Sequence, residues 1–238
     1  LSDTGTDKGE YDMKGILING SPKRNGSASG VLLVDLRSLL APDTETAVMA
    51  VTAAHPAASP AYTGMHWEPS PDEQKKLGGL SFLVLSFPLY VDGIPSHLLS
   101  FLTELERWQN QSRLLEGDKP LAVYAAVNCG FYEGKQAAIA LRIVENWCVR
   151  CGFEYKQGIG CGAGGILAHL KGAPLAKGPK KPLGAALTDM AANIERLEKG
   201  NDRFFSLSIP RPLYIAAAHI GWRKQGRENG LTVKELKS

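Results

Sequence analysis

The sequence has few cysteines, no long hydrophobic run and only a slight excess of positive charge. Its longest apolar stretch, about residues 80–91, is interrupted by serine and proline and falls short of the roughly 18–20 residues that span a bilayer. Residues 1–11 are polar and acidic, so we expect no secretory signal there. Four cysteines in 238 residues are too few for a disulfide framework, and they favour a reducing, cytoplasmic location.

The charge balance gives no reason to expect nucleic acid as a partner. The 27 basic residues exceed the 24 acidic ones by only three, whereas nucleic-acid-binding domains are usually strongly basic. The hydrophobic share of 44% is ordinary for a globular protein and predicts a packed core. The length predicts one domain, or one domain with an appendage.

Metal-binding and hydrolase motifs are also missing. The five histidines are scattered and form no His-x3-His pair. Cys148 and Cys151 match Cys-x-x-Cys, but they fall at the end of a predicted helix, where the dipole disfavours a thiolate. We interpret them as core or boundary cysteines and expect no zinc or iron–sulfur site. No Gly-x-Ser-x-Gly elbow supports a hydrolase.

Apolar runs of strand character alternate with segments of helical spacing. The predicted strands are residues 14–19, 46–51, 80–87, 120–127 and 153–159. The predicted helices are residues 26–40, 72–77, 95–108, 134–150 and 183–197. This alternation predicts an α/β protein with a five-stranded parallel sheet and helices on both faces. Ligands of such sheets bind beyond the carboxyl ends of the strands, so we expect a site in the loops that follow them.

The loop after the first strand has the composition of a phosphate site. Ser21, Asn25 and Ser27 offer side-chain donors, and Gly26 leaves backbone N–H groups uncovered. The helix that follows adds the positive end of its dipole, and Lys23 adds a full charge. The loop does not match a Walker P-loop. The alternative interpretation is an ordinary helix-capping loop with solvated basic residues.

Two further loops carry aromatic and aliphatic side chains at strand ends. In residues 87–95, proline and glycine fix an irregular path whose tip suits the face of a flat ring; the alternative is a packing turn. In residues 128–134, Phe131 and Tyr132 stand between glycines, where they would lie against a bound ring or another subunit. Cys129 has no neighbouring histidine or second cysteine, which favours a buried thiol over a redox role.

A fourth loop, residues 160–165, matches Gly-x-Gly-x-x-Gly. That fingerprint is typical of dinucleotide-binding βαβ units, which also need a later strand and an acidic residue about 20 positions on. No strand is evident after Gly165, so we reject the dinucleotide interpretation. We expect a flexible glycine turn at the rim of the site.

As a set, these loops resemble the flavodoxin-like NADPH-dependent FMN reductase family, close to its iron–sulfur flavoprotein and multimeric flavodoxin branch. The motifs that carry the resemblance are Gly20-Ser21-Pro22-Lys23-Arg24-Asn25-Gly26-Ser27, Pro88-Leu89-Tyr90-Val91-Asp92-Gly93-Ile94-Pro95, Asn128-Cys129-Gly130-Phe131 and the glycines of residues 158–165. The resemblance covers about residues 14–200 and implies a flavodoxin-like three-layer sandwich with strand order 2-1-3-4-5. The compact cysteine cluster of iron–sulfur members is absent after the second strand, so no cluster is implied.

The resemblance also implies a site and its ligands. It implies FMN with its phosphate on the first loop and its ring between the second and third loops, and NAD(P)H as co-substrate. The implied cofactor-binding residues are Ser21, Pro22, Lys23, Asn25, Gly26, Ser27, Ala28, Pro88, Leu89, Tyr90, Val91, Asp92, Gly93, Asn128, Cys129, Gly130, Phe131 and Tyr132. No catalytic side chain is implied, because the flavin carries the chemistry. A homodimer or homotetramer is implied as well.

Three segments follow from this interpretation: a polar N-terminal segment (1–13), a flavodoxin-like FMN-binding domain (14–200) and a C-terminal helical extension (201–238). The extension has apolar residues at helical spacing between positions 213 and 222, followed by basic residues. We expect it to pack on its own domain or on a neighbouring subunit, because clustered apolar side chains are rarely left in water. A basic amphipathic helix at a membrane surface is the alternative.

The resulting function hypothesis is an FMN-binding NAD(P)H-dependent oxidoreductase. It would pass electrons from a nicotinamide through FMN to a small acceptor such as a quinone or free flavin. The alternative is a flavodoxin-type electron carrier that docks on redox partners without using NAD(P)H. Carriers of that type are strongly acidic around the flavin, and the slightly basic charge of this chain disfavours that role. A module that has lost flavin is disfavoured by the intact first loop.

Overall fold

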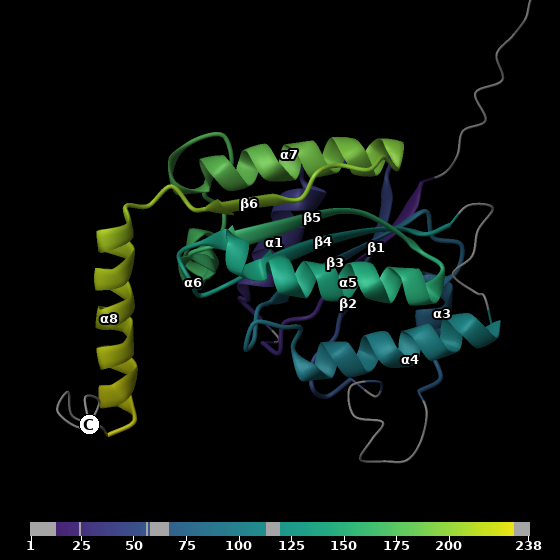
Figure 1. The fold of residues 1–238 in the computed structure, drawn as a ribbon, viewed down its shortest axis with the longest axis horizontal. Coiled ribbons are helices and arrows are strands. Elements are labelled where there is room, and N and C mark those ends of the chain that lie inside the picture. The colour runs from purple at the N-terminus through teal and green to yellow at the C-terminus, as the bar shows by residue number, and fades with distance from the viewer. Residues whose placement is uncertain (1–12, 24, 56, 58–66, 113–119, 231–238) are drawn as a thin grey trace, which may run out of the picture.

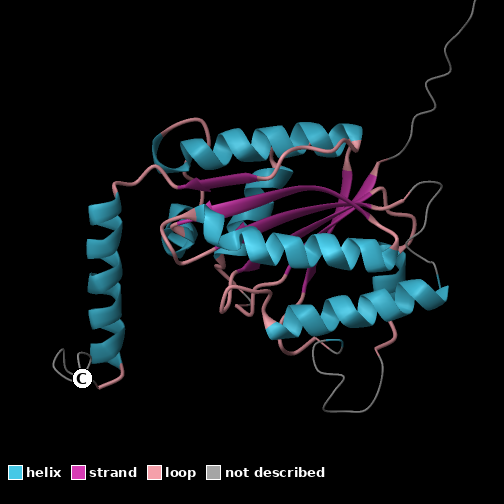
Figure 2. Cartoon of the chain, in the orientation of Figure 1, coloured by secondary structure: helices cyan, strands magenta, loops and turns pink. Residues whose placement is uncertain are grey.

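The computed structural model describes residues 13–23, 25–55, 57, 67–112 and 120–230. Six strands form one sheet in the order β2-β1-β3-β4-β5-β6, and every neighbouring pair is parallel. The strands, shown in Figures 1 and 2, are β1 (Lys14–Asn19), β2 (Glu45–Ala50), β3 (Phe82–Pro88), β4 (Ala122–Asn128), β5 (Glu154–Gly162) and β6 (Arg203–Ser206). The reversal of strand order after β1 puts a switch point between β1 and β3, where ligands of open α/β sheets bind.

Helices lie on both faces of the sheet, as the alternation of elements predicts (Figure 1). The α-helices are α1 (Ala28–Arg37), α3 (Pro71–Leu77), α4 (Ser96–Ser112), α5 (Ala138–Cys151), α6 (Gly164–Leu167), α7 (Lys181–Arg196) and α8 (Arg211–Glu228). Short 3₁₀ turns are η2 (Gly134–Ala137), η3 (Ala168–Leu170) and η4 (Gly178–Lys180). The apolar sides of α4 and α5 bury one face of the sheet, and those of α1 and α7 bury the other.

The central strands are buried on both faces, which explains their unbroken apolar sequences. In β1, Ile16 and Ile18 point into the core under α4 and α5, whereas Leu17 points into the core under α1 and α7. In β3, Leu83 and Phe82 divide between the same two cores. Strands enclosed on both sides need apolar residues at every position, as is usual for parallel sheets.

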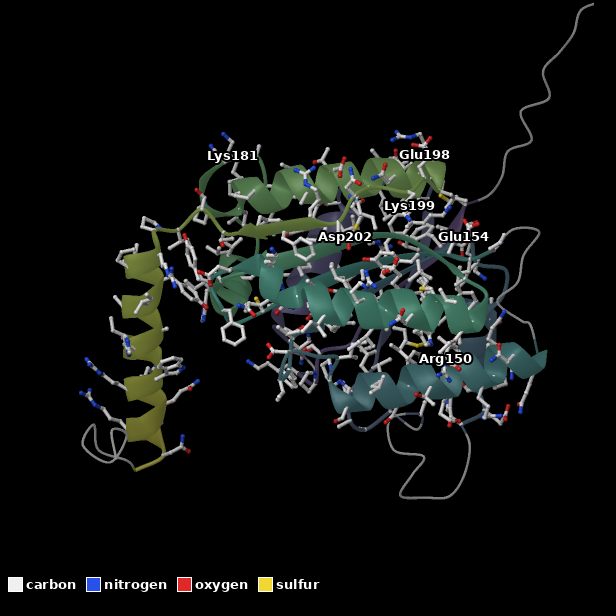
Figure 3. All side chains as sticks on the ribbon, viewed as in Figure 1. Arg150, Glu154, Lys181, Glu198, Lys199 and Asp202 are labelled. Carbon is white, nitrogen blue, oxygen red and sulfur yellow. The ribbon has the colours of Figure 1, made fainter. Side chains whose placement is uncertain are left out.

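The sheet has six strands rather than the five expected from the sequence. β6 pairs with β5 through four residues and extends the predicted order 2-1-3-4-5 by one strand. Asp202, at the start of β6 (Figure 3), accepts a hydrogen bond from the backbone N–H of Gly158 at 2.7 Å. Two of the four residues are exposed and two are half-buried, and with only Phe204 and Phe205 apolar they form too short an apolar run for the sequence to indicate a strand. The sheet therefore takes in residues that we assigned to the extension.

Glycines at the end of β5 form strand rather than the flexible turn that the sequence suggested. β5 runs through Gly162, and a Cβ there would overlap the carbonyl of Tyr132. A Cβ on Gly134 would likewise overlap the carbonyls of Gly160 and Phe205. Glycine at these positions lets the loop after β4 lie directly against the backbones of β5 and β6, a recognised use of glycine within strands.

Helix α8 stands away from the rest of the molecule (Figures 1 and 2). Its first turns are docked: the Tyr214 hydroxyl donates to the carbonyl of Gly130 at 2.5 Å. Beyond this point Ile220 and Trp222 are exposed, and the side chains of the helix project into open space (Figure 3). The expected packing on the chain's own domain is thus found for β6 and the start of α8. Within the described residues, none of the helices combines the length and hydropathy that a bilayer crossing requires.

A buried ion pair joins α1 to the start of α7. The Lys180 ammonium, wholly inaccessible to solvent, lies 2.6 Å from a carboxylate oxygen of Asp35. In the described part of the chain these two atoms have no hydrogen-bond partner beyond this pairing. Loss of either charge would leave the other buried and uncompensated, which is the costly case for buried pairs.

Exchange of Lys180 for methionine should therefore lower the free energy of unfolding by about 3–5 kcal/mol. Urea unfolding followed by circular dichroism measures this loss. The double variant Asp35→Leu/Lys180→Met removes both charges and should recover most of it. A single Lys180→Met variant as stable as the parent would contradict the assignment.

Candidate functional site

A hollow of about 330 Å³ opens at the carboxyl edge of the sheet, where the loops after β1, β3 and β4 meet. It lies at the switch point between β1 and β3. The described residues that line it are Ser21, Lys23, Gly26, Ser27, Ala28, Ser29, Pro88, Leu89, Tyr90, Asn128, Gly130, Gly164, Gly165 and Ala168. We call this hollow the cradle.

The first turn of α1 supplies backbone donors to the cradle. Ser27 is the N-cap, and its hydroxyl accepts from the N–H of Gly30 at 3.0 Å. The N–H groups of Ala28 and Ser29 lie in the first turn of the helix. Helix geometry provides no intrahelical acceptor for the N–H groups of that turn. Gly26 has a left-handed φ of 66°, and a Cβ on it would meet nothing within 4 Å. An anion can approach this N-terminus closely, and the dipole favours it.

A buried polar network fixes the floor of the cradle. The Asn128 side-chain amide donates to the Ser29 hydroxyl at 2.8 Å and to the carbonyl of Phe87 at 3.2 Å. The hydroxyl of Ser86 donates to the carbonyl of Ser29 at 3.1 Å. These bonds tie the ends of β3 and β4 to the first turn of α1. Since all three polar side chains are buried, their pairing also avoids the cost of isolated polar groups.

A histidine also holds the loop after β1, on the side opposite to the Asn128 network. The buried His97 ring, at the start of α4, donates from Nε2 to the carbonyl of Gly20 at 3.1 Å. The N–H of Gly20 donates in turn to the backbone carbonyl of Ser86 at 2.8 Å. Burial lowers the pKa of His97 below its ordinary value, partly opposed by its hydrogen bonds to backbone carbonyls. The neutral ring is therefore the form that fits this position.

The loop after β3 forms a tight turn at the rim. Tyr90 and Gly93 exchange backbone hydrogen bonds of 3.1 and 2.9 Å. Between them Val91 and Asp92 adopt left-handed φ values of 47° and 58°, which is strained for a β-branched residue. The N–H of Leu89 donates to the carbonyl of Asn128 at 2.8 Å. The turn thus presents the half-exposed Tyr90 ring beside the cradle on a fixed backbone.

The side chains of the loop after β4 lie in three different environments. Cys129 is buried, and burial raises the pKa of its thiol, so it is not poised as a thiolate. Phe131 is exposed. Tyr132 packs against the chain's own C-terminal segment: its hydroxyl donates to the carbonyl of Ile209 at 2.8 Å, and its ring centroid lies 5.8 Å from that of Tyr214.

The structure brings together much of the set that the resemblance implied. The implied cofactor-binding residues that line the cradle are Ser21, Lys23, Gly26, Ser27, Ala28, Pro88, Leu89, Tyr90, Asn128 and Gly130. Those that do not are Pro22, Asn25, Val91, Asp92, Gly93, Cys129, Phe131 and Tyr132. Lining residues absent from that set are Ser29, Gly164, Gly165 and Ala168. The glycine-rich composition of residues 160–165 was the sequence signal for Gly164 and Gly165, whereas nothing in the sequence indicates that Ser29 or Ala168 lines the site.

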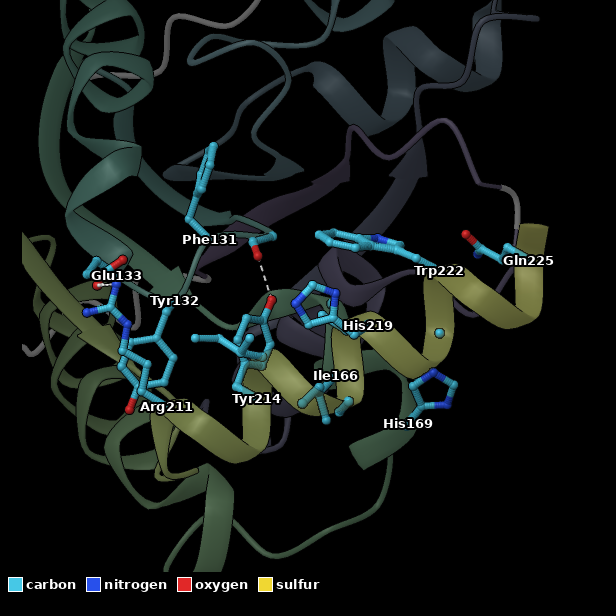
Figure 4. Close-up of a pocket in the computed structure, with 16 residues that line it drawn as sticks. Phe131, Tyr132, Glu133, Ile166, His169, Arg211, Tyr214, His219, Trp222 and Gln225 are labelled. Atoms are coloured by element: carbon cyan, nitrogen blue, oxygen red, sulfur yellow. Dashed lines mark hydrogen bonds and ion pairs between the residues drawn. The ribbon is translucent and has the colours of Figure 1, made fainter. Parts of the chain in front are cut away.

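A second, larger hollow of about 840 Å³ lies between α8 and the loop after β4 (Figure 4). It shares Gly130 and Gly165 with the cradle, so the two hollows adjoin. We call it the α8 groove. The sequence did not indicate that α8 belongs to a site, because the wall of this groove forms only through the position of α8 relative to the sheet. Among the described residues no three metal-ligating side chains gather at one place.

Comparison with known proteins adds the class of fold. No family model and no curated protein sequence matches the chain. Among solved structures, it is similar to an NAD(P)H:quinone oxidoreductase from Methanothermobacter marburgensis, with a TM-score of 0.52 and 12% identity over 77% of this chain and 96% of that one. An oxidoreductase from Corynebacterium diphtheriae matches with a TM-score of 0.51 and 11% identity over 78% and 97%.

RosB, solved with 8-demethyl-8-formylriboflavin-5'-phosphate bound, matches with a TM-score of 0.51 and 16% identity over 78% of both chains. At these identities the likenesses establish the fold. The chain has an α/β flavodoxin-like fold, as the resemblance implied, with a sixth parallel strand.

Stability should fall as the pH drops below about 6.5, and His97 should contribute to the fall. The pKa of His97 is lowered in the folded state, so the unfolded chain takes up the proton at a higher pH than the folded chain does. For one proton, the free energy of unfolding falls by at most about 1.4 kcal/mol per pH unit. The stabilisation is complete above pH 6.5 and is lost as the pH falls toward the folded pKa. Urea unfolding at pH 7.0 and 5.5 should show a smaller difference for His97→Gln than for the parent. An equal difference would exclude His97 as the cause.

Proposed function

We propose that the protein binds FMN in the cradle and acts as an NAD(P)H-dependent oxidoreductase toward a small acceptor. The observation that carries the proposal is the cradle itself: a hollow at the switch point of a flavodoxin-like sheet, into which the first turn of α1 directs free backbone donors. Support also comes from the flavin phosphate bound to RosB and from the NAD(P)H:quinone oxidoreductase activity named for another structure of the same fold.

The residues present fit the phosphate end of FMN. The buried hydroxyl of Ser21 and the N–H groups at Ala28 and Ser29 would hold phosphate oxygens. The open space at Gly26 admits them without a clash. Lys23 is exposed at the mouth, where its charge would favour the bound anion.

The other side of the cradle fits a flat ring. Pro88, Leu89 and Tyr90 would flank it from the loop after β3. Gly130 would leave one side open, since a Cβ there would meet nothing within 4 Å. When bound, FMN supplies a two-electron centre that takes a hydride from NAD(P)H and delivers two electrons to a second substrate. The protein's part is to orient the ring, keep one face accessible and place backbone dipoles near it.

The phosphate contact is tested by a loop variant with a matched serine elsewhere on α1. Ser21→Ala should weaken FMN binding at least roughly tenfold, about 1.4 kcal/mol, because a charge-assisted donor to the phosphate is lost. Ser38→Ala changes an exposed serine at the far end of α1, whose hydroxyl bonds only locally to Asp35, and should leave binding unchanged. Flavin fluorescence titration gives both affinities. Equal affinities for the two variants would contradict the assignment.

The reaction is tested by anaerobic stopped-flow mixing of the FMN-loaded protein with NADH and with NADPH. We expect at least one of them to bleach the flavin absorbance within seconds, and a quinone to restore it. The two substrates would share the open face in turn, which predicts ping-pong kinetics. If neither nicotinamide reduces the flavin while a reduced protein partner does, the electron-carrier alternative replaces this proposal.

A further inference from the structure

The α8 groove adjoins the open side of the cradle. Gly130 and Gly165 line both hollows, and a Cβ on Gly130 would point into free space. The Tyr214 hydroxyl holds α8 to this junction through its bond to the Gly130 carbonyl. A molecule lying in the groove would thus reach the open side of a ring held in the cradle. The groove volume of about 840 Å³ is within the range of small-molecule sites.

Aromatic rings line the groove from both sides. Figure 4 shows Tyr214, His219 and Trp222 following one another along α8, on the side that looks toward Phe131. The His219 and Trp222 rings meet edge to face with centroids 5.6 Å apart. Phe131 is 54% exposed and Trp222 is 63% exposed. Such rings offer stacking faces to a planar ligand.

The charges around the groove favour an anion. Its carboxylate, Glu133, lies 3.4 Å from the guanidinium of Arg211 and is thereby neutralised. Helix α8 carries four basic residues and one acidic residue between positions 211 and 228. Three of the basic residues, Arg223, Lys224 and Arg227, lie in its last two turns. They lie outside the lining of the groove, and the Lys224 ammonium is 3.8 Å from the carboxylate of Glu228. With Glu228 counted, this end of the helix keeps a net positive charge, whose longer-range field would attract an acidic group on the ligand.

We propose that the α8 groove binds a planar aromatic molecule that carries an acidic group, with Trp222 as the residue that determines its specificity. The proposal rests on the proposed function, since this molecule would be the second substrate of the flavin in the cradle. Sulfonated quinones and nicotinamide dinucleotides share this chemistry. The electrostatic contribution predicts that affinity falls with added salt.

Two variants on the same helix separate the groove from the rest of α8. Trp222 lines the groove, whereas Ile220, 66% exposed, lies outside its lining. Trp222→Ala should raise the dissociation constant and the KM for 1,4-naphthoquinone-2-sulfonate about tenfold with little change in kcat, and Ile220→Ala should stay within about twofold. Calorimetric titration of the quinone sulfonate measures binding without turnover. Neutral 1,4-naphthoquinone should bind the parent more weakly, and NADH and NADPH are titrated as the second source of the same chemistry.

The outcomes distinguish this proposal from the function on which it rests. Failure of the protein to bind FMN, with quinone sulfonate binding still dependent on Trp222, would overturn the proposed function and leave the groove assignment standing. Normal flavin reduction with equal quinone affinities for Trp222→Ala and the parent would overturn the groove assignment. The other tryptophans are buried, so acrylamide quenching reports on Trp222. Protection of Trp222 in a dimer that Trp222→Ala dissociates would assign the groove to a second copy and overturn the proposal.

Discussion

The hydrogen bonds from the Asn128 amide to Ser29 and to the end of β3 are the contacts on which the cradle depends. They join three segments that are distant in sequence, and they are buried, so no water competes for them. With the Ser86 hydroxyl they hold the first turn of α1 at a fixed place above the sheet. The free N–H groups of that turn are therefore oriented before any ligand arrives. His97 adds a brace on the opposite side of the same loop.

A second constraint acts at the other end of the site, where backbones pack without side chains between them. Gly134, Gly160 and Gly162 let the loop after β4 lie against β5 and β6. That close contact positions Gly130 at the boundary of the two hollows. The C-terminal segment then closes over the loop through Tyr132 and Tyr214. β6 and α8 thus help to position the residues of the site.

The two constraints divide the site between a rigid part and an open part. The cradle side is enclosed by strands buried on both faces, and it offers donors suited to an anion. The groove side is bounded by a helix docked only at its start, and it offers exposed rings. This arrangement is compatible with the proposed binding of a cofactor on one side and of exchanging substrates on the other.

Much of the fold follows from local sequence. The apolar run closed by a Gly-Ser-Pro turn fixed both ends of β1 as predicted. The central strands β1, β3 and β4 were recognisable because burial on both faces requires continuous apolar residues. Ser21, Gly26 and Ser27 were readable as a phosphate-type loop because their donors and backbone freedom lie within one short segment.

Tertiary structure alone decided the rest. Strand β6 has only four residues, none of them fully buried, and their pairing depends on an edge supplied by β5. The end of β5 has glycine at every second position. The sequence alone indicates a turn there, and only the structure shows another backbone packed against these glycines. Ser29 belongs to the site through its hydrogen bond with Asn128, a residue 99 positions away. The α8 groove exists because of the direction in which α8 leaves the sheet, and that direction is set by contacts between Tyr214 and Gly130 across 84 positions, which no local pattern encodes.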